Sequence, residues 1–340
     1  MPVPAKLVTL LGLLGKEEAT YGTAIALTTT SDGLLMQFTD RNIGAPASIE
    51  YAYDGDLGPS VASGATTKRA APAGRSFRAS IPFRAKGYGT AYSAANVPTP
   101  HKFIKAAGFD AALTSTTSSE KYTYTPTAEG TGYTSLTLNA YARGELWAAS
   151  GVVGTLSVNF DNQAPPVWTF DCRGIASVPT DAAVPTITYP SFSVIPPLAS
   201  SATVVIGSYT TNAIVLGGSF TFNRGIDNPR VPISGTHLGF VPSGRGPRMT
   251  LTIEQSAFVG SPYHTSAGID PTMLREAATS IAVSVAFGST QYNRYTIAMA
   301  TAQLVNVTPA NNGPTATVTL EFAGHGSSPT TNDDCSITFD

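Results

Sequence analysis

Apolar and polar residues alternate with a period of two along much of the chain. The segments with this pattern are 136–142, 155–160, 167–172, 249–253 and 317–322, together with the more apolar 281–287. Such alternation, rich in Val, Ile, Thr and aromatic residues, is typical of strands with one buried face. Clusters of turn-forming residues at 161–166, 242–247 and 309–314 predict the connections between strands. The sequence therefore predicts a mainly β protein.

Two segments have helical periodicity instead. In 98–109, Thr99 is a candidate N-cap, Pro100 suits the first turn and Gly108 can end the helix. The segment 269–280 begins with an Asp-Pro pair that suits a helix start in the same way. We expect one helix in each half of the chain.

The order of these patterns repeats between the two halves. The segments 38–43 (FTDRNI) and 221–226 (TFNRGI) each precede a loop, a strand, a helix and a closing hairpin. Aligning the hairpins pairs Leu156 with Val305, an offset of 305 − 156 = 149 residues. The shared order favours an internal duplication, and chance similarity between alternating strands is the alternative.

A proline-rich segment separates the two halves. The residues 177–198 include five prolines, which exclude a regular central strand and predict an extended connector. We therefore expect an N-terminal arm at 1–17, a first domain at 18–180, a linker at 181–198 and a second domain at 199–340.

Charge is scarce and unevenly distributed. Charged residues number 20 + 22 = 42 of 340, or 12%, against the ~25% usual for soluble domains. The stretches 182–223 and 295–320 contain no Asp, Glu, Lys or Arg. Because monomeric β proteins usually place charge on exposed edges, we expect part of this surface to be buried between identical subunits. A surface kept soluble by Ser and Thr hydroxyls is the alternative.

The sequence lacks the motifs of common active sites. With a net charge of −2, the chain lacks the basic character of proteins that bind phosphate groups. Cys172 and Cys335 fit neither a disulfide framework nor a metal-binding spacing. The apolar run 7–14 is too short to span a bilayer, and it lacks the strongly basic start and the clean cleavage region of a signal peptide. Without a nucleophile elbow, a P-loop or paired metal-ligand histidines, we expect no catalytic residue, metal, cofactor or membrane span.

A series of short motifs runs along nearly the whole chain. They are KEEATYGT (16–23), LGPS (57–60), FRASIPFRAKG (77–87), KFIKAAGF (102–109), SGVVGTLSVNF (150–160), WTFDCRGIASVPTDAAVP (168–185), FTFNRGI (220–226) and AQLVNVTPANNG (302–313). In this order they resemble the tail tube proteins, or major tail proteins, of bacteriophages with long non-contractile tails. The resemblance implies two tandem tail-tube-type β-sandwich or barrel domains, each with one flanking helix.

The resemblance also implies a structural virion protein rather than an enzyme. Such proteins self-assemble into stacked rings that form the tail tube, the conduit for DNA ejection into the host. A duplicated chain could close a ring with three subunits as a pseudo-hexamer, and a ring of six is the alternative. The implied partners are further copies of the chain and the tape measure, tail terminator and distal tail proteins. DNA would pass through the lumen without specific binding, in a virion tail assembled in the host cytoplasm.

Two loops are candidates for contacts between stacked rings, because 41–75 and 225–247 precede equivalent strands. The candidate residues are Tyr51, Tyr53, Asp54, Asp56, Leu57, Arg230, His237 and Arg245. The two aspartates could touch calcium, but a lone Asp-Gly-Asp lacks further oxygen ligands, so a solvated turn is the preferred interpretation.

A second class of protein stays open from the sequence. A monomeric carbohydrate-binding β-sandwich module on a virion or cell surface would use aromatic side chains as a sugar platform. Trp147 and Tyr133 are candidates for that role. The chain has only two tryptophans, however, and both lie in strand-like surroundings, which favours packing in the core.

Overall fold

The computed structural model describes most of the chain. The described residues are 10–36, 76–116, 119–128, 133–142, 144–161, 164–191, 193–207, 215–226, 239–240, 242–254, 275–276, 278–313, 315–328 and 331–340. The strands are β1 (Leu10–Glu17), β2 (Ser76–Phe83), β3 (Phe109–Thr114), β4 (Lys121–Pro126), β5 (Leu136–Ala142), β6 (Glu145–Asp161), β7 (Val167–Ala176), β8 (Thr180–Asp181), β9 (Thr203–Ile206), β10 (Val215–Gly225), β11 (Ser243–Glu254), β12 (Ser280–Phe287), β13 (Tyr295–Asn312), β14 (Thr315–Gly324) and β15 (Ser336–Phe339). The helices are α1 (His101–Ala106) and the short 3₁₀ turn η1 (Ala199–Ser201). The prediction of a mainly β protein is confirmed.

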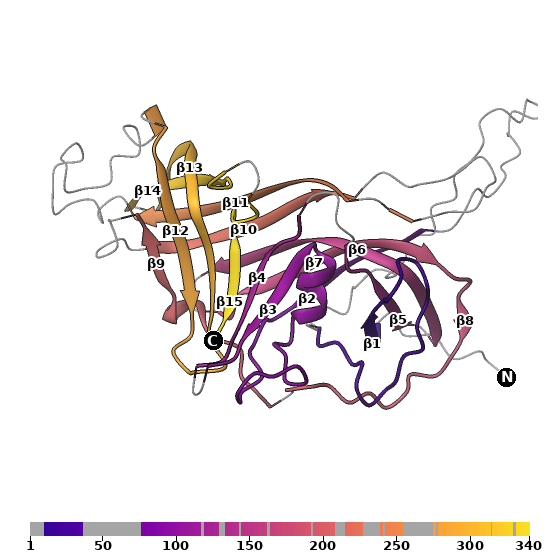
Figure 1. Ribbon diagram of the computed structural model, residues 1–340. Coiled ribbons are helices and arrows are strands. Elements are labelled where there is room, and N and C mark those ends of the chain that lie inside the picture. Colours follow the sequence, from indigo (N-terminus) through magenta and orange to yellow (C-terminus); the bar gives the residue numbers. More distant parts are fainter. Residues whose placement is uncertain are drawn as a thin grey trace, which may run out of the picture.

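The described strands belong to one antiparallel sheet that curls around the core. Its main path runs β1-β5-β6-β10-β11-β14-β13-β15-β4-β3, and β7 connects β2 to β6. Figure 1 shows α1, β3 and β4 below the long strands β6, β10 and β11. Because β10 pairs with both β6 and β11, the sheet is continuous between the two halves of the chain. The division into two domains at 181–198 stays a prediction.

Two long strands organise the sheet by changing partners along their length. On one edge, β6 pairs first with β5 and then with β10, and its other edge carries β7. On one edge, β13 pairs with β12, and its other edge carries β15 and then β14. Register shifts in β6 and β13 bend these strands where the partners change.

The two halves share the order of four paired strands. In the first half the order is β5-β6-β7-β2, and in the second it is β12-β13-β14-β11. The residue-level match is weaker, because Leu156 is fully buried whereas Val305 is 38% exposed at a bulge in β13. Strand order therefore agrees with the predicted repeat, and the aligned pair Leu156 and Val305 does not.

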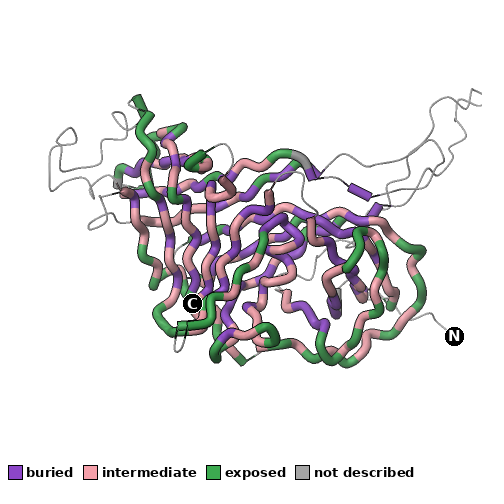
Figure 2. The backbone as a smooth tube through the Cα atoms, viewed as in Figure 1, coloured by how far each residue is buried: buried purple, intermediate pink, exposed green. Residues whose placement is uncertain are grey.

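One large aromatic core joins the two halves. Trp168 of β7 is fully buried, and its indole N–H donates a hydrogen bond to the Tyr295 hydroxyl of β13 at 3.2 Å. The Tyr295 ring also packs on Phe339 with ring centroids 5.2 Å apart. Figure 2 shows the alternation along the strands, with buried segments between exposed and intermediate ones. This shared core binds the curled sheet together.

The helix α1 is shorter than predicted and begins differently. It starts at His101, and its N-cap position, Pro100, makes no side-chain cap hydrogen bond. The expected cap, Thr99, instead accepts a hydrogen bond from the Lys86 backbone N–H and donates one to the Lys86 carbonyl. Gly108 ends the helix as expected, with a φ of +95° that favours glycine.

Three other predictions either lie largely outside the described residues or differ from the structure. The predicted helix 269–280 lies largely outside them. The predicted turn 242–247 is wrong, because its residues from Ser243 onward belong to β11. Pro247 is tolerated in this strand because it pairs only with β10, so its other side is a strand edge. In the predicted N-terminal arm, Leu10–Glu17 form β1, which pairs with β5.

Candidate assembly surfaces

The predicted ring-stacking residues fall almost entirely outside the described part of the chain. Those not described are Tyr51, Tyr53, Asp54, Asp56, Leu57, Arg230 and His237. Arg245 is described, and its side chain is directed at its own chain rather than at a partner. Its guanidinium donates hydrogen bonds to the Asn332 side chain at 2.8 Å and the Thr127 carbonyl at 3.2 Å, and it pairs with Asp334 at 3.2 Å. Arg245 therefore braces the loop before β15.

The motif at 16–23 forms a hydrogen-bonded clasp at the start of the chain. The carboxylate of Glu18 accepts hydrogen bonds from the backbone N–H groups of Gly22 and Gly151, at 2.8 and 2.9 Å. It also accepts from the hydroxyls of Ser135 and Thr137, at 2.6 and 2.8 Å. One side chain thus ties the segment after β1 to β5 and β6.

Tyr21 extends this clasp into the second half of the chain. Its hydroxyl donates to the Phe240 carbonyl at 2.9 Å and accepts from the Phe240 N–H at 2.8 Å, across 219 residues. Phe240 packs with Val153 and Ile226 in a small apolar cluster. Sequence reasoning missed Tyr21 and Glu18 as bracing residues, although the motif that contains them was the available signal.

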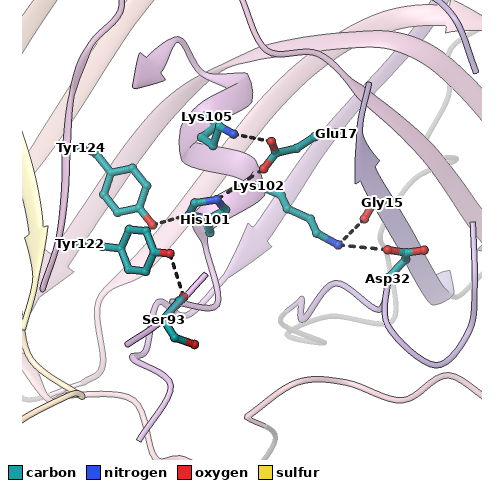
Figure 3. A network of polar contacts seen from close by, with 9 residues as sticks. All are labelled: Gly15, Glu17, Asp32, Ser93, His101, Lys102, Lys105, Tyr122 and Tyr124. Atoms are coloured by element: carbon teal, nitrogen blue, oxygen red, sulfur yellow. Dashed lines mark hydrogen bonds and ion pairs between the residues drawn. The ribbon is translucent and has the colours of Figure 1, made fainter. Parts of the chain in front are cut away.

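A second polar network holds α1 against β1 and β4 (Figure 3). Burial lowers the pKa of His101 to about 4, with Glu17 opposing and Lys105 and Lys102 reinforcing the decrease, so the imidazole is neutral at pH 7. Its Nε2 lies 3.5 Å from Glu17, which favours the proton on that nitrogen. Nδ1 then accepts a hydrogen bond of 2.8 Å from the Tyr124 hydroxyl.

The partners of His101 are themselves held in place. Glu17 forms an ion pair with Lys105, one turn along the helix. Burial raises the pKa of Tyr124, so its hydroxyl keeps the proton that it donates. Because both ring nitrogens of His101 face protein groups, neither is left to accept a proton from a substrate. The network therefore positions the helix.

A partly buried ion pair fixes the other side of α1. The Lys102 ammonium donates to the Gly15 carbonyl at 2.7 Å and lies 3.5 Å from Asp32. Burial alone would raise the pKa of Asp32, but hydrogen bonds from Thr28 and the charge of Lys102 hold it below its usual value. Figure 3 shows Lys102 reaching from the helix to Asp32 beside β1.

The described residues bear on three further kinds of feature: a metal centre, a membrane-spanning helix and a sugar-binding platform. Among them, no group of three or more His, Cys, Asp or Glu side chains could hold a metal ion. No helix in this described part is long and apolar enough to cross a membrane. Of the two candidate sugar-platform residues, Trp147 packs against the core and Tyr133 lies with its ring centroid 4.2 Å from the guanidinium carbon of buried Arg224. Neither forms a flat, fully exposed platform.

The second half of β13 has a free edge. Residues 295–303 of β13 pair with β12, but on that edge the stretch 304–312 faces no other described strand. The matching edge of β6 is filled, since 156–161 pair with β10. The stretch 304–312 carries no charged residue, and Val305 is 38% exposed. We call 304–312 the open edge; uncharged edges of this kind readily pair with another chain.

The proline-rich connector adds exposed apolar side chains. Its backbone is fixed to the molecule, because the Val194 carbonyl accepts a hydrogen bond from the Lys86 ammonium at 2.8 Å, and the Ile195 carbonyl accepts one from the Asn293 side chain at 2.8 Å. The side chains of Ile195 and Leu198 are nevertheless 77% and 44% exposed. Apolar groups held at fixed positions on the surface are suited to contacts with another protein.

The fold and these surfaces define a β-rich chain with an open strand edge and surface apolar side chains. Comparison of the sequence with protein-family models and with curated proteins finds no match. The function is therefore inferred from three features of the molecule: the open edge, the connector and the composition of the sheet.

Proposed function

We propose that this protein is a structural virion protein whose copies join into rings and stack as the tail tube of a phage with a long non-contractile tail. The proposal is carried by one observation: β6 has its edge filled by β10, whereas the equivalent edge of β13 is open. The motif series that resembles tail tube proteins agrees with it.

The two edges suggest how a ring closes. The junction between β6 and β10 joins the two halves within one chain through six residue pairs. A strand of a neighbouring copy, paired with the open edge, would repeat this junction between chains. If the halves are duplicates, three copies give six similar junctions and a closed ring without strand edges. The alternative of six copies per ring is compatible with the same edge.

Strand pairing alone is a modest source of affinity. Six residue pairs contribute about six hydrogen bonds, each worth about 1 kcal/mol net. Association costs about 4–15 kcal/mol in lost freedom of motion. The apolar side chains of Ile195, Leu198 and Val305 would therefore have to supply part of the binding free energy.

The edge is tested by placing a charge on it. Val305→Lys adds a charge to the open edge without touching the core, so it should leave the folded chain intact and prevent assembly. Ala94→Lys is the matched control, because Ala94 is also exposed but does not lie on the open edge. It belongs to a loop next to β4, where the Ser93 carbonyl accepts a hydrogen bond from the Tyr122 hydroxyl. Electron microscopy and light scattering of the purified proteins compare assembly, and thermal unfolding checks the fold.

The expected result is rings or tubes from the wild type and the control, and monomers from the Val305→Lys variant. Assembly of that variant at wild-type levels would contradict the role of the open edge. A wild-type protein that stays monomeric at high concentration would contradict the proposed function itself.

A further inference from the structure

One face of the central sheet is covered by small polar side chains. On β6, β10, β11, β14 and β13, most of the residues that alternate with the core residues are half-buried or exposed, whereas Val153 and Thr317 on this side are buried. The members of this surface, which we call the hydroxyl face, are Ser157, Asn159, Ser219, Thr221, Thr250, Thr252, Asn306, Thr308 and Thr319. Their neighbours along the strands, such as Val158, Phe220 and Leu251, are fully buried on the opposite face.

The hydroxyl face is continuous because the strand registers place these side chains in rows. One row runs across three strands through the directly paired residues Asn159, Ser219 and Thr250. The next row contains Thr252 and Thr319, whose hydroxyls lie 3.2 Å apart. Paired residues project from the same side of a sheet, so the rows form one surface.

The charges on this face are few and mainly negative. Among the described residues of these five strands, the cation on this side is Arg248, which forms an ion pair with Glu321 on the neighbouring strand. On the adjoining strand β7, the same side carries Asp171 and Arg173. Asp161 and Glu254 are further carboxylates on the same side of the sheet, by the alternation of their strands. The described strands β6, β10, β11, β13 and β14 contain no lysine. A phosphate chain would therefore find no unpaired cation among these positions.

We infer that the hydroxyl face lines the channel of the proposed tube and is the surface along which double-stranded DNA passes; this rests on the proposed function. Interfaces between proteins are enriched in aromatic residues, Met and other apolar groups at their centre. The hydroxyl face has none at the positions named above, so it is suited to stay hydrated. Of the large apolar side chains exposed among the described residues, Val178, Ile195 and Leu198 lie on the connector and Tyr21 lies in the clasp; Val305 is next to Asn306 on the open edge.

The same composition fits a surface that contacts DNA without holding it. Affinity for duplex DNA comes largely from cations that displace counterions from phosphates. Hydroxyls and amides can exchange hydrogen bonds with the water around DNA, whereas the excess of carboxylates opposes tight contact. DNA can then slide along rows of neutral side chains.

Thiol accessibility tests which face lines the channel. The native thiols, Cys172 and Cys335, are each only 1% exposed, so an introduced cysteine provides the main signal. Thr250→Cys places a thiol on the hydroxyl face, and Thr252→Cys is a second variant in case the first does not assemble. Ala94→Cys is the control, because Ala94 is exposed on the loop that Ser93 joins to β4 rather than on the hydroxyl face. Each cysteine variant is prepared in two forms: as assembled tubes, and in the non-assembling Val305→Lys background. Both forms are treated with a small maleimide and, separately, with a polymer-linked maleimide that is wider than the channel.

In tubes, we expect Thr250→Cys to react with the small reagent and to lose its reaction with the large one. Ala94→Cys should react with both, and in the non-assembling chain both thiols should react with both reagents. If the large reagent modifies Thr250→Cys and Thr252→Cys in tubes as fast as it modifies the control, the inference about the channel lining is wrong, although the proposed tube assembly still stands. A wild-type chain that forms no tubes would instead overturn the proposed function, and the inference with it.

Discussion

Acidification should destabilise this protein through one buried imidazole. His101 faces Glu17 of β1, Lys102 and Lys105 of its own helix, and Tyr122 and Tyr124 of β4. Burial is the main cause that lowers its pKa from 6.5 to about 4. The unfolded chain therefore binds a proton near pH 6.5, whereas the folded chain resists protonation until about pH 4.

The sign and size of the effect follow from this difference. As the pH falls from 6.5 towards 4, the unfolded state takes up a proton that the folded state does not, so the free energy of unfolding decreases. Each pKa unit corresponds to 1.36 kcal/mol, which gives a loss of about 3 kcal/mol across the window. Above pH 6.5 this contribution to stability is fully present, and below pH 4 it is fully lost.

The His101→Gln variant isolates this contribution. Glutamine can still hydrogen-bond to Tyr124 but does not titrate, so the variant should lose about 3 kcal/mol less stability on acidification than the wild type. At neutral pH we expect a cost of about 1 kcal/mol from imperfect hydrogen bonding. Urea unfolding above, within and below the window measures both values, and subtraction removes contributions common to the two proteins.

The control is His325→Gln, because the side chain of His325 is exposed. If His101→Gln and the wild type lose equal stability across the window, His101 does not enter the folded state as a neutral buried group, and the account of the network around α1 is wrong. The Val305→Lys background keeps assembly from affecting the measurement.

Two further predictions concern the clasp and the proposed stacking loop. Tyr21→Phe removes both hydrogen bonds to Phe240 while keeping the ring, so the free energy of unfolding should fall by about 1–3 kcal/mol in urea titrations; an unchanged value would show that the clasp does not stabilise the fold. Deletion of 48–64 should leave rings but abolish tubes in electron micrographs, and tubes of normal length would refute a stacking role for that loop.

Several parts of the structure could be predicted locally from the sequence. Alternation of apolar and polar residues identified β6, β7, β11 and β14, because side-chain direction in a strand has a period of two whatever its partner. Gly108 marked the end of α1, because a positive φ favours glycine in any context. The shared order of patterns in the two halves also agrees with the order of paired strands.

The surfaces proposed for function were less predictable from the sequence. The scarcity of charge in 295–320 led to the prediction of a surface shared between copies, but it did not show that 304–312 is the open edge. A local pattern cannot reveal which strand edge is filled, since that depends on partners far away in the chain. The hydroxyl face likewise became visible only when strand registers aligned Ser219 with Asn159 and Thr250.

That the chain forms strands, where α1 ends and which residues face a core could all be read from the order of the amino acids, because these features follow from local backbone preference and burial. Three features became visible only in the folded chain: Tyr21 hydrogen-bonds to Phe240, Thr99 bonds to Lys86 instead of capping α1, and β10 pairs with the edge of β6. These outcomes depend on contacts between distant segments. A hydrogen-bonding side chain has several possible partners, and the packing of the folded chain determines which of them it contacts.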